Sequence, residues 1–267
     1  MRTVLRTLLQ LGVVAALAAA MVWGQNSTPS SKATYAINTA VGCTASQNGS
    51  TSTTSILYDC HDIFTGATIT PDANNFVTIM TATVKVSNSE SLFVSPSLVT
   101  GLYTDTKVKT STGSTSTATA MGGVYLTADL VDSSGNVIYA DPVDDCATEI
   151  LGCQQVTGGS GNEWGVTLDS RIQTLTQTLS DCVVSTGGSC NFSSTIDLLL
   201  NTTSAHTFNF IFANVGVGVY TLEIKAAVNS NATATSGSSA IAGAAFGLGS
   251  VTADVVRLLQ GSNSFSF

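Results

Sequence analysis

The chain has 267 residues, with nine basic residues, 17 acidic residues and a formal net charge of −8 at pH 7. Charged residues make up only 10% of it, against about a quarter in an average domain. This acidity, and the lack of lysine and arginine clusters, exclude nucleic acids and anionic membrane surfaces as expected partners.

The first 24 residues have the pattern of a secretory signal peptide. Arg2 and Arg6 precede an apolar run, Leu8–Val22, and Gly24 stands at the −1 position of a cleavage site. Cleavage would leave seven basic against 17 acidic residues, a net charge of −10. A retained N-terminal anchor is the alternative. We expect a secreted protein, extracellular or at the cell surface, with no membrane span after cleavage.

All six cysteines follow this segment, and an even number in a secreted chain indicates disulfides. Pairing of nearest neighbours gives Cys43–Cys60, Cys146–Cys153 and Cys182–Cys190. The alternative is a zinc site, which is disfavoured because there is no C-x-x-C pair and His61 and His206 are the only histidines.

The chain divides by composition into an arm, a domain and a tail. Residues 25–65 are rich in serine, threonine, asparagine and glycine, which predicts a loose N-terminal arm carrying Cys43 and Cys60. Residues 66–260 predict a β-sandwich domain, and residues 261–267 a C-terminal tail.

Alternation of apolar and polar side chains predicts most of the strands. The pattern is found in Phe76–Val86, Val124–Tyr139 and Val166–Leu179, and Gly135 allows a hairpin turn inside the second range. A last strand is expected over Val251–Leu259. Pro96 predicts an edge strand or a turn for residues 92–99. The threonine-rich residues 110–120 are either a flexible loop or an edge strand.

The C-terminal third predicts a short helix and a strand pair. Ser194 resembles a helix N-cap with an acidic residue three positions on, so a short helix through residues 198–200 is expected. Phe208–Phe212 and Tyr220–Ala226 alternate on both sides of a glycine-containing link, which predicts an antiparallel pair with one buried face.

The segment Gly218-Val219-Tyr220-Thr221-Leu222-Glu223-Ile224 resembles the tyrosine corner of immunoglobulin-like and fibronectin-type β-sandwiches. The resemblance implies that Tyr220 bonds back to the backbone and that Phe208–Phe212 form the preceding strand. Leu222 stands where antibody domains have a cysteine. Residues 97–107 resemble uncharacterised secreted proteins. Neither resemblance implies an activity. The expected fold is an all-β, antiparallel, Ig-like β-sandwich with a short helix and disulfide-stapled loops.

Catalytic motifs are missing from the sequence. There is no G-x-S-x-G elbow, H-E-x-x-H pair or phosphate-binding glycine loop. We interpret His206 as a polar strand residue and His61 as part of a disulfide-held loop. A glycosidase needs two carboxylates about 5–10 Å apart, for which the candidates are Glu149, Glu163 and Asp169.

An acidic loop is a candidate for a structural calcium site formed by Asp141, Asp144, Asp145 and Glu149 and constrained by a Cys146–Cys153 disulfide. The alternative is a solvated acidic loop. No other cofactor is expected.

Trp164 is the candidate for stacking on carbohydrate, with burial in the core as the alternative, and Tyr103, Tyr125 and Tyr139 are further candidates. Five asparagines begin glycosylation sequons: Asn26, Asn48, Asn191, Asn201 and Asn231.

The favoured function is therefore a secreted, non-catalytic cell-surface or extracellular-matrix protein that acts by binding or self-assembly. The alternatives are a carbohydrate-binding module for extracellular polysaccharide and a secreted hydrolase built on carboxylates. Residues 110–120 and the tail Phe265–Phe267 are the expected edges for pairing with another copy, and a monomer is the alternative.

Overall fold

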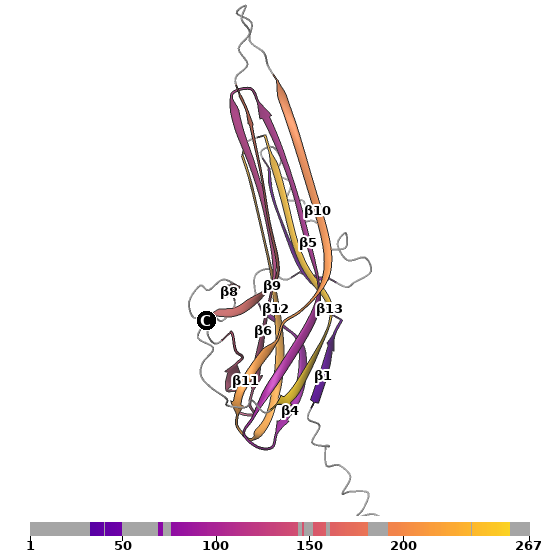
Figure 1. Cartoon of the computed structure of the whole chain (residues 1–267), viewed down its shortest axis with the longest axis vertical. Coiled ribbons are helices and arrows are strands. Elements are labelled where there is room, and N and C mark those ends of the chain that lie inside the picture. The colour runs from indigo at the N-terminus through magenta and orange to yellow at the C-terminus, as the bar shows by residue number, and fades with distance from the viewer. Residues whose placement is uncertain are drawn as a thin grey trace, which may run out of the picture. The chain divides into compact units, whose positions relative to one another are not determined.

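The structure is a computed structural model that describes residues 33–39, 41–49, 69–71, 76–143, 146, 152–158, 161–180, 192–235 and 237–256. The chain separates into the units Met1–Lys32 and Ala33–Phe267, and every described residue belongs to the second. The regular elements of the described residues are all strands, which face each other in two sheets and confirm the predicted all-β sandwich (Figure 1). They are β1 (Ala33–Asn38), β2 (Val41–Gly49), β3 (Ile69–Pro71), β4 (Val77–Val86), β5 (Glu90–Ser111), β6 (Ser114–Val131), β7 (Val137–Tyr139), β8 (Cys153–Gly158), β9 (Gly161–Leu179), β10 (Ser193–Thr207), β11 (Phe210–Val215), β12 (Gly218–Ala234) and β13 (Ser239–Val256).

The first sheet has the strand order β10-β5-β13-β2-β3, with β1 beside β13 and β11 beside β5. The second has the order β4-β12-β6-β9-β8, with β7 beside β6. All pairings are antiparallel except that of β2 with β3. The alternating strands are found where they were predicted, and Gly135, with φ 84°, lies in the turn between β6 and β7.

Part of the expected loose arm is ordered strand. Both β1 and β2 pair with β13, β1 through Asp254–Gly249 and β2 through Ser239–Phe246. In β1 the more buried positions alternate but are Thr34, Ala36 and Asn38, while Tyr35 and Ile37 are exposed. β1 therefore lacks the apolar alternation that predicts a strand. Its backbone pairing with β13, which covers all of its residues, holds it in the sheet.

The predicted short helix after Ser194 is wrong, because this segment is strand β10. The N-cap pattern is a local signal, and it is overridden by a continuous ladder in which β10 pairs with Ser97–Ser111 of β5. Leu198–Leu200 therefore extend along the edge of a sheet.

The predicted pairing of Phe208–Phe212 with Tyr220–Ala226 is also wrong. β11 pairs with β5 in the first sheet, and β12 lies between β4 and β6 in the second. The glycine-containing link crosses between the sheets, so the buried faces of both strands share one core. The hydrogen bond expected of Tyr220 is present, since its Oη donates to Gly216 O over 3.0 Å.

Two segments expected at an edge lie inside the sheets. Pro96 is in β5 between β13 and the β10–β11 side, and its missing N–H falls where β11 gives way to β10. Its carbonyl accepts a bond from Phe208 N over 3.2 Å. Residues 114–120 pair with β9, and residues 118–120 also pair with β12. The threonine-rich segment is therefore not a free edge.

Bulges in both sheets separate two differently packed halves of the sandwich. Gly247 and Leu248 of β13 lie opposite the single residue Val99, and Leu168 is an extra residue in β9. On one side is the aromatic half, whose core includes Leu92, Leu126, Phe210, Phe212, Leu222 and Ile224. On the other is the alanine half, whose core is Val108, Ala118, Ala120, Ala232, Ala240 and Ala242.

Candidate functional site

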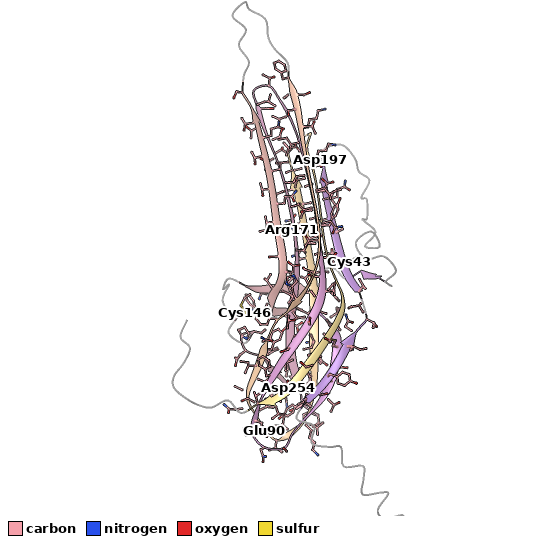
Figure 2. All side chains as sticks on the ribbon, turned by 45° about the vertical axis from the view of Figure 1, so that its right-hand side comes forward. Cys43, Glu90, Cys146, Arg171, Asp197 and Asp254 are labelled. Carbon is pink, nitrogen blue, oxygen red and sulfur yellow. A yellow bond between two sulfur atoms is a disulfide. The ribbon has the colours of Figure 1, made fainter. Side chains whose placement is uncertain are left out.

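The outer edge of β10 is a long strand edge without a partner strand among the described residues. β10 pairs with β5 over all 15 of its residues, and no described strand pairs with its other edge. Opposite it, β9 is paired with β8 only through Gly161–Val166. Among the described residues, both sheets therefore end in the alanine half in a strand edge without a partner, and Gln173 places these two edges next to each other (Figures 1 and 2).

Polar side chains hold these two edges together. Gln173 of β9 donates through Nε2 to Thr106 Oγ1 over 2.6 Å and to Leu198 O over 2.7 Å, and it accepts a bond from Thr104 Oγ1 over 2.8 Å. Arg171 of β9 donates to Thr202 Oγ1. These contacts tie β10 to β9 of the opposite sheet, and one of them uses the backbone carbonyl of Leu198.

An apolar row follows the same edge. Ile196, Leu198 and Leu200 alternate along β10 and remain 41%, 41% and 42% exposed. Leu199, which points to the other face of the sheet, is 56% exposed. The ionisable residues of β10 are Asp197 and His206, and Asp197 pairs with Lys107 of β5 over 3.6 Å. The sequence signal that could have revealed this strand is the run of β-branched residues around the three leucines.

Asp105 of β5 and Asp197 of β10 form a carboxyl pair on the other face of the sheet, the face of Leu199. Burial and the neighbouring charge of Asp197 raise the pKa of Asp105, and Lys107 opposes the effect. The Asp105 carboxyl beside β10 therefore ionises at a higher pH than an isolated aspartate would.

His206 and Asp169 meet where the two halves join, but they do not form a catalytic triad. Ser204 Oγ lies 2.6 Å from His206 Nε2, and Asp169 Oδ2 lies 3.4 Å from the same nitrogen. A triad uses one ring nitrogen for the nucleophile and the other for the acid. Thr100 Oγ1 donates to Asp169 Oδ2 over 2.7 Å, so the cluster links β9 to β5 and β10.

The candidate hydrolytic carboxylates are not brought together. The extra residue Leu168 reverses the alternation in β9, so Asp169 faces the first sheet while Glu163 lies on the opposite face of the second sheet. Glu149 lies outside the described residues.

Glu163 instead belongs to a charged cluster centred on Lys225, which sequence reasoning missed. Lys225 Nζ lies 2.7 Å from Asp129 Oδ2, 2.8 Å from Glu163 Oε1 and 4.0 Å from Glu223 Oε2. Burial raises the pKa of Asp129, although Lys225 opposes this. Burial alone would lower the pKa of Lys225, but its bonds to Asp129 and Glu163 outweigh that effect and raise it. The sequence signal that could have revealed this cluster is the presence of charged residues within predicted strands, in a chain that has few charged residues.

The predicted calcium loop is described only in part. Asp141 is exposed and its backbone bonds to Ile211, whereas Asp144, Asp145 and Glu149 lie outside the described residues. Within the described ranges, no group of three or more histidine, cysteine, aspartate and glutamate side chains is arranged to hold a metal ion.

The aromatic candidates for carbohydrate binding do not form a platform. Trp164 packs against the core of the aromatic half, and Tyr103 and Tyr125 are buried, while Tyr139 is exposed. Of the sequon asparagines, Asn201 and Asn231 are exposed. Asn26 and Asn191, and the side chain of Asn48, lie outside what the structure describes.

The predicted Cys146–Cys153 disulfide is confirmed. Cys43 is also disulfide-bonded. Cys60, Cys182 and Cys190 lie outside the described residues, so the other two pairings stay predictions.

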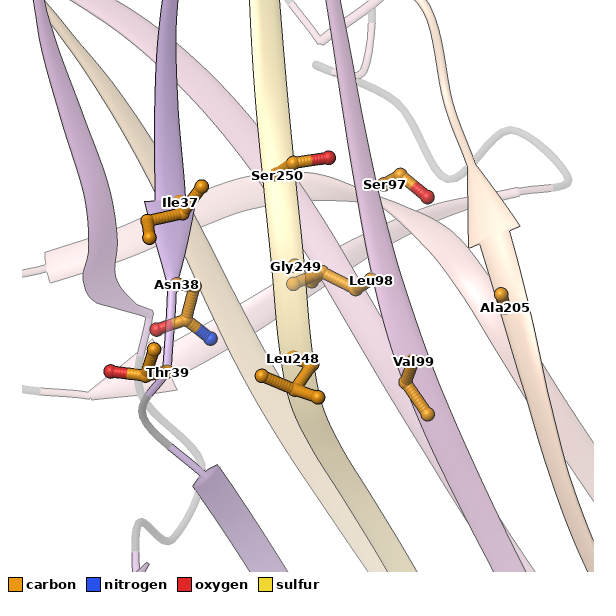
Figure 3. Close-up of a pocket in the computed structure, with 10 residues that line it drawn as sticks. All are labelled: Ile37, Asn38, Thr39, Ser97, Leu98, Val99, Ala205, Leu248, Gly249 and Ser250. Atoms are coloured by element: carbon orange, nitrogen blue, oxygen red, sulfur yellow. The ribbon is translucent and has the colours of Figure 1, made fainter.

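A hollow of ≈ 350 Å³ lies on the first sheet at the β13 bulge (Figure 3). Ile37, Leu98, Val99 and Leu248 line it together with small and neutral polar residues, and no charged group contributes. Asn38 supports the bulge from β1 by donating through Nδ2 to Gly247 O over 3.0 Å. The hollow is apolar and carries no chemistry of its own.

Among the described residues there is no helix long and apolar enough to cross a membrane. No family model and no curated protein matches the chain. A chain in a structure of infectious bursal disease virus, Gt strain, is 10% identical with a TM-score of 0.15, over 86% of this chain and 43% of that one. The parasporin-2 toxin of Bacillus thuringiensis is 11% identical with a TM-score of 0.10, over 84% and 74%. The chain thus spans less than half of the viral chain, and likenesses this weak carry no argument.

Proposed function

We propose that this is a secreted, non-catalytic protein of the cell surface or extracellular matrix that acts by self-assembly, and that the outer edge of β10 pairs with β10 of a second copy. The observation that carries this proposal is a 15-residue strand whose outer edge has no partner strand among the described residues and which bears a row of half-exposed apolar side chains. The secretory pattern of residues 1–24 and the Cys146–Cys153 disulfide support the location.

The backbone of an antiparallel edge strand is complementary to itself. Two copies related by a two-fold axis present the same N–H and C=O groups to each other, and each copy completes the other's ladder. A strand of 15 residues offers about 50 Å of such edge. Ile196, Leu198 and Leu200 would then lose water on the same face of the joined sheet.

The protections that usually block edge pairing are absent from β10. Natural sheets place lysine, proline or a bulge on long edge strands. Ser193–Thr207 contains no lysine, arginine or proline, and its register with β5 is unbroken. Its aspartate, Asp197, is paired within the chain by Lys107.

Light scattering and sedimentation of the purified chain over a range of concentrations test the proposal. We expect dimers or larger species in the wild type and a shift towards monomer in L198K and L200K. A matched control is I172K, because Ile172 is 70% exposed but points away from the first sheet on β9. A wild type that stays monomeric at all concentrations, or equal effects of the three substitutions, would contradict it.

We further propose that the sandwich is related to the immunoglobulin-like type. The bond from Tyr220 to Gly216 and the crossing between the sheets just before it support this relationship.

A further inference from the structure

Lys225, Asp129 and Glu163 come from three adjacent strands of the second sheet, β12, β6 and β9 (Figure 1). The amine of Lys225 lies 2.7 Å from the Asp129 carboxyl and 2.8 Å from the Glu163 carboxyl. The side chain of Asp129 is only 1% exposed and that of Lys225 is 20% exposed. An amine, a buried carboxyl that it can attack and a second carboxyl that can carry a proton are therefore held in contact.

We propose that Lys225 and Asp129 condense to an intramolecular amide that cross-links β12 to β6, with Glu163 as the proton carrier. The inference does not depend on assembly through β10.

The reaction balances within the cluster. A proton passes from the Lys225 ammonium to the Asp129 carboxylate, which leaves a neutral amine beside a carboxylic acid. Nζ attacks Cγ, a second proton moves from Nζ through Glu163 to the departing hydroxyl, and one water molecule leaves. The C–O bond of Asp129 is replaced by a C–N bond, Glu163 ends as the carboxylate it began as, and no oxidant or other reactant is required.

Position and burial both favour this step. Well-oriented groups within one molecule react as if each were present at about 10⁵–10⁸ M, which offsets the advantage that water has in hydrolysing amides. Burial disfavours a pair of charges relative to the neutral amine and acid, and it raises the pKa of Asp129. Burial thus favours the acid form of Asp129. The contacts with Asp129 and Glu163 raise the pKa of Lys225 and oppose its deprotonation, so the step depends on the close approach of the buried carboxyl and the amine.

The surroundings of the cluster fit an amide better than a fully satisfied ion pair. Thr127 Oγ1 and both carboxyl oxygens of Asp129 are buried without a partner in hydrogen-bond geometry among the described residues. The close approach of Lys225 Nζ to Asp129 Oδ2, at 2.7 Å, is therefore a contact of charges and not a well-aligned hydrogen bond. Thr127 is directly opposite Lys225 in the register of β6 and β12. Buried polar groups are normally hydrogen-bonded. In the condensed form, the amide carbonyl gives the Thr127 hydroxyl a neutral acceptor.

Peptide mapping of the purified full chain by mass spectrometry, after reduction of disulfides and removal of any glycans, tests the proposal. We expect a branched peptide joining the segments around residues 129 and 225, lighter than their sum by one water molecule. Lys225→Arg removes the nucleophile and is expected to give only unbranched peptides. Glu163→Gln is expected to fold but to lose or strongly slow the cross-link.

Glu223→Gln is the matched control, because Glu223 lies farther from Nζ, at 4.0 Å, and is not required for the step. It should form the cross-link as the wild type does. Circular dichroism confirms that each variant is folded, and if Lys225→Arg does not fold, the wild-type map decides alone. Unbranched peptides throughout folded wild-type protein would overturn the proposal, as would a cross-link that forms equally well in Glu163→Gln.

Discussion

Gly122 of β6 and Gly243 of β13 touch across the sandwich: a Cβ atom at position 122 would lie 2.7 Å from Gly243 O. The two strands belong to opposite sheets. The alanine half begins next to this contact, and its core consists of small side chains. The sheets approach closely here because neither residue has a side chain, and the same closeness brings Gln173 within reach of β5 and β10.

Gly122→Ala should destabilise the protein by about 1–3 kcal/mol, the usual range for overpacking a tight interior. The added methyl meets backbone, which cannot move without separating the sheets. Thermal unfolding checks this, with Gly216→Ala as the control, since the nearest atom to a Cβ there is 3.6 Å away. Equal melting temperatures for the two variants would show that the sheets can separate freely.

Tyr220→Phe should lower the free energy of unfolding by about 1 kcal/mol, because it removes one hydrogen bond and leaves Gly216 O without its donor. Chemical denaturation measures the change. Tyr139→Phe removes a hydroxyl from an exposed ring and is expected to change stability little. If the two substitutions have the same effect, the bond from Tyr220 does not stabilise the crossing between the sheets.

Local sequence patterns predicted where the strands lie but not which strands pair with each other. The alternation in Phe76–Val86 and the turn at Gly135 depend on adjacent residues, and both were found where the sequence placed them. β11 and β12 were assigned to one sheet because they are consecutive and each has one buried face. A shared core between two sheets leaves the same pattern in the sequence, so periodicity cannot distinguish the two arrangements.

The candidate sites depend even more on distant pairing. Asp129 and Lys225 meet only because β6 and β12 are adjacent in a particular register. β10 was hidden by a helix-capping pattern that a ladder with β5 overrides. The separation of Glu163 from Asp169 depends on one extra residue, Leu168, and a bulge of this kind has no signature in apolar alternation. Tyr220 was predictable because its bond returns to a residue four positions earlier.

Replacing both Cys146 and Cys153 by alanine should lower stability by about 2–3 kcal/mol, the loop-closure value for a short loop. The disulfide joins residues seven positions apart, and Cys146 is buried. The comparison is between the double variant and the oxidised wild type in thermal unfolding without reductant. If the double variant has the same melting temperature as the wild type, the disulfide orders only its own loop and does not stabilise the rest of the fold.

Acidification should stabilise the folded chain through Asp105, whose pKa is raised by burial and by Asp197. The folded state binds this proton more tightly than the unfolded state, so its contribution is fully present below the ordinary pKa of 3.8 and is lost as pH rises through the raised value. Asp105→Asn should therefore be more stable than the wild type at neutral pH, and its stability should vary less between neutral and acid pH. Asp254→Asn, at an exposed carboxyl of β13, measures the general effect of removing one negative charge. Asp129, whose pKa is also raised, is present in all three proteins and cancels in the comparison.

Because protonation removes negative charge beside β10, self-association should also strengthen on acidification in the wild type and become less dependent on pH in Asp105→Asn. Sedimentation at matched concentrations measures this, and an unchanged pH profile in Asp105→Asn would exclude the carboxyl pair as its origin.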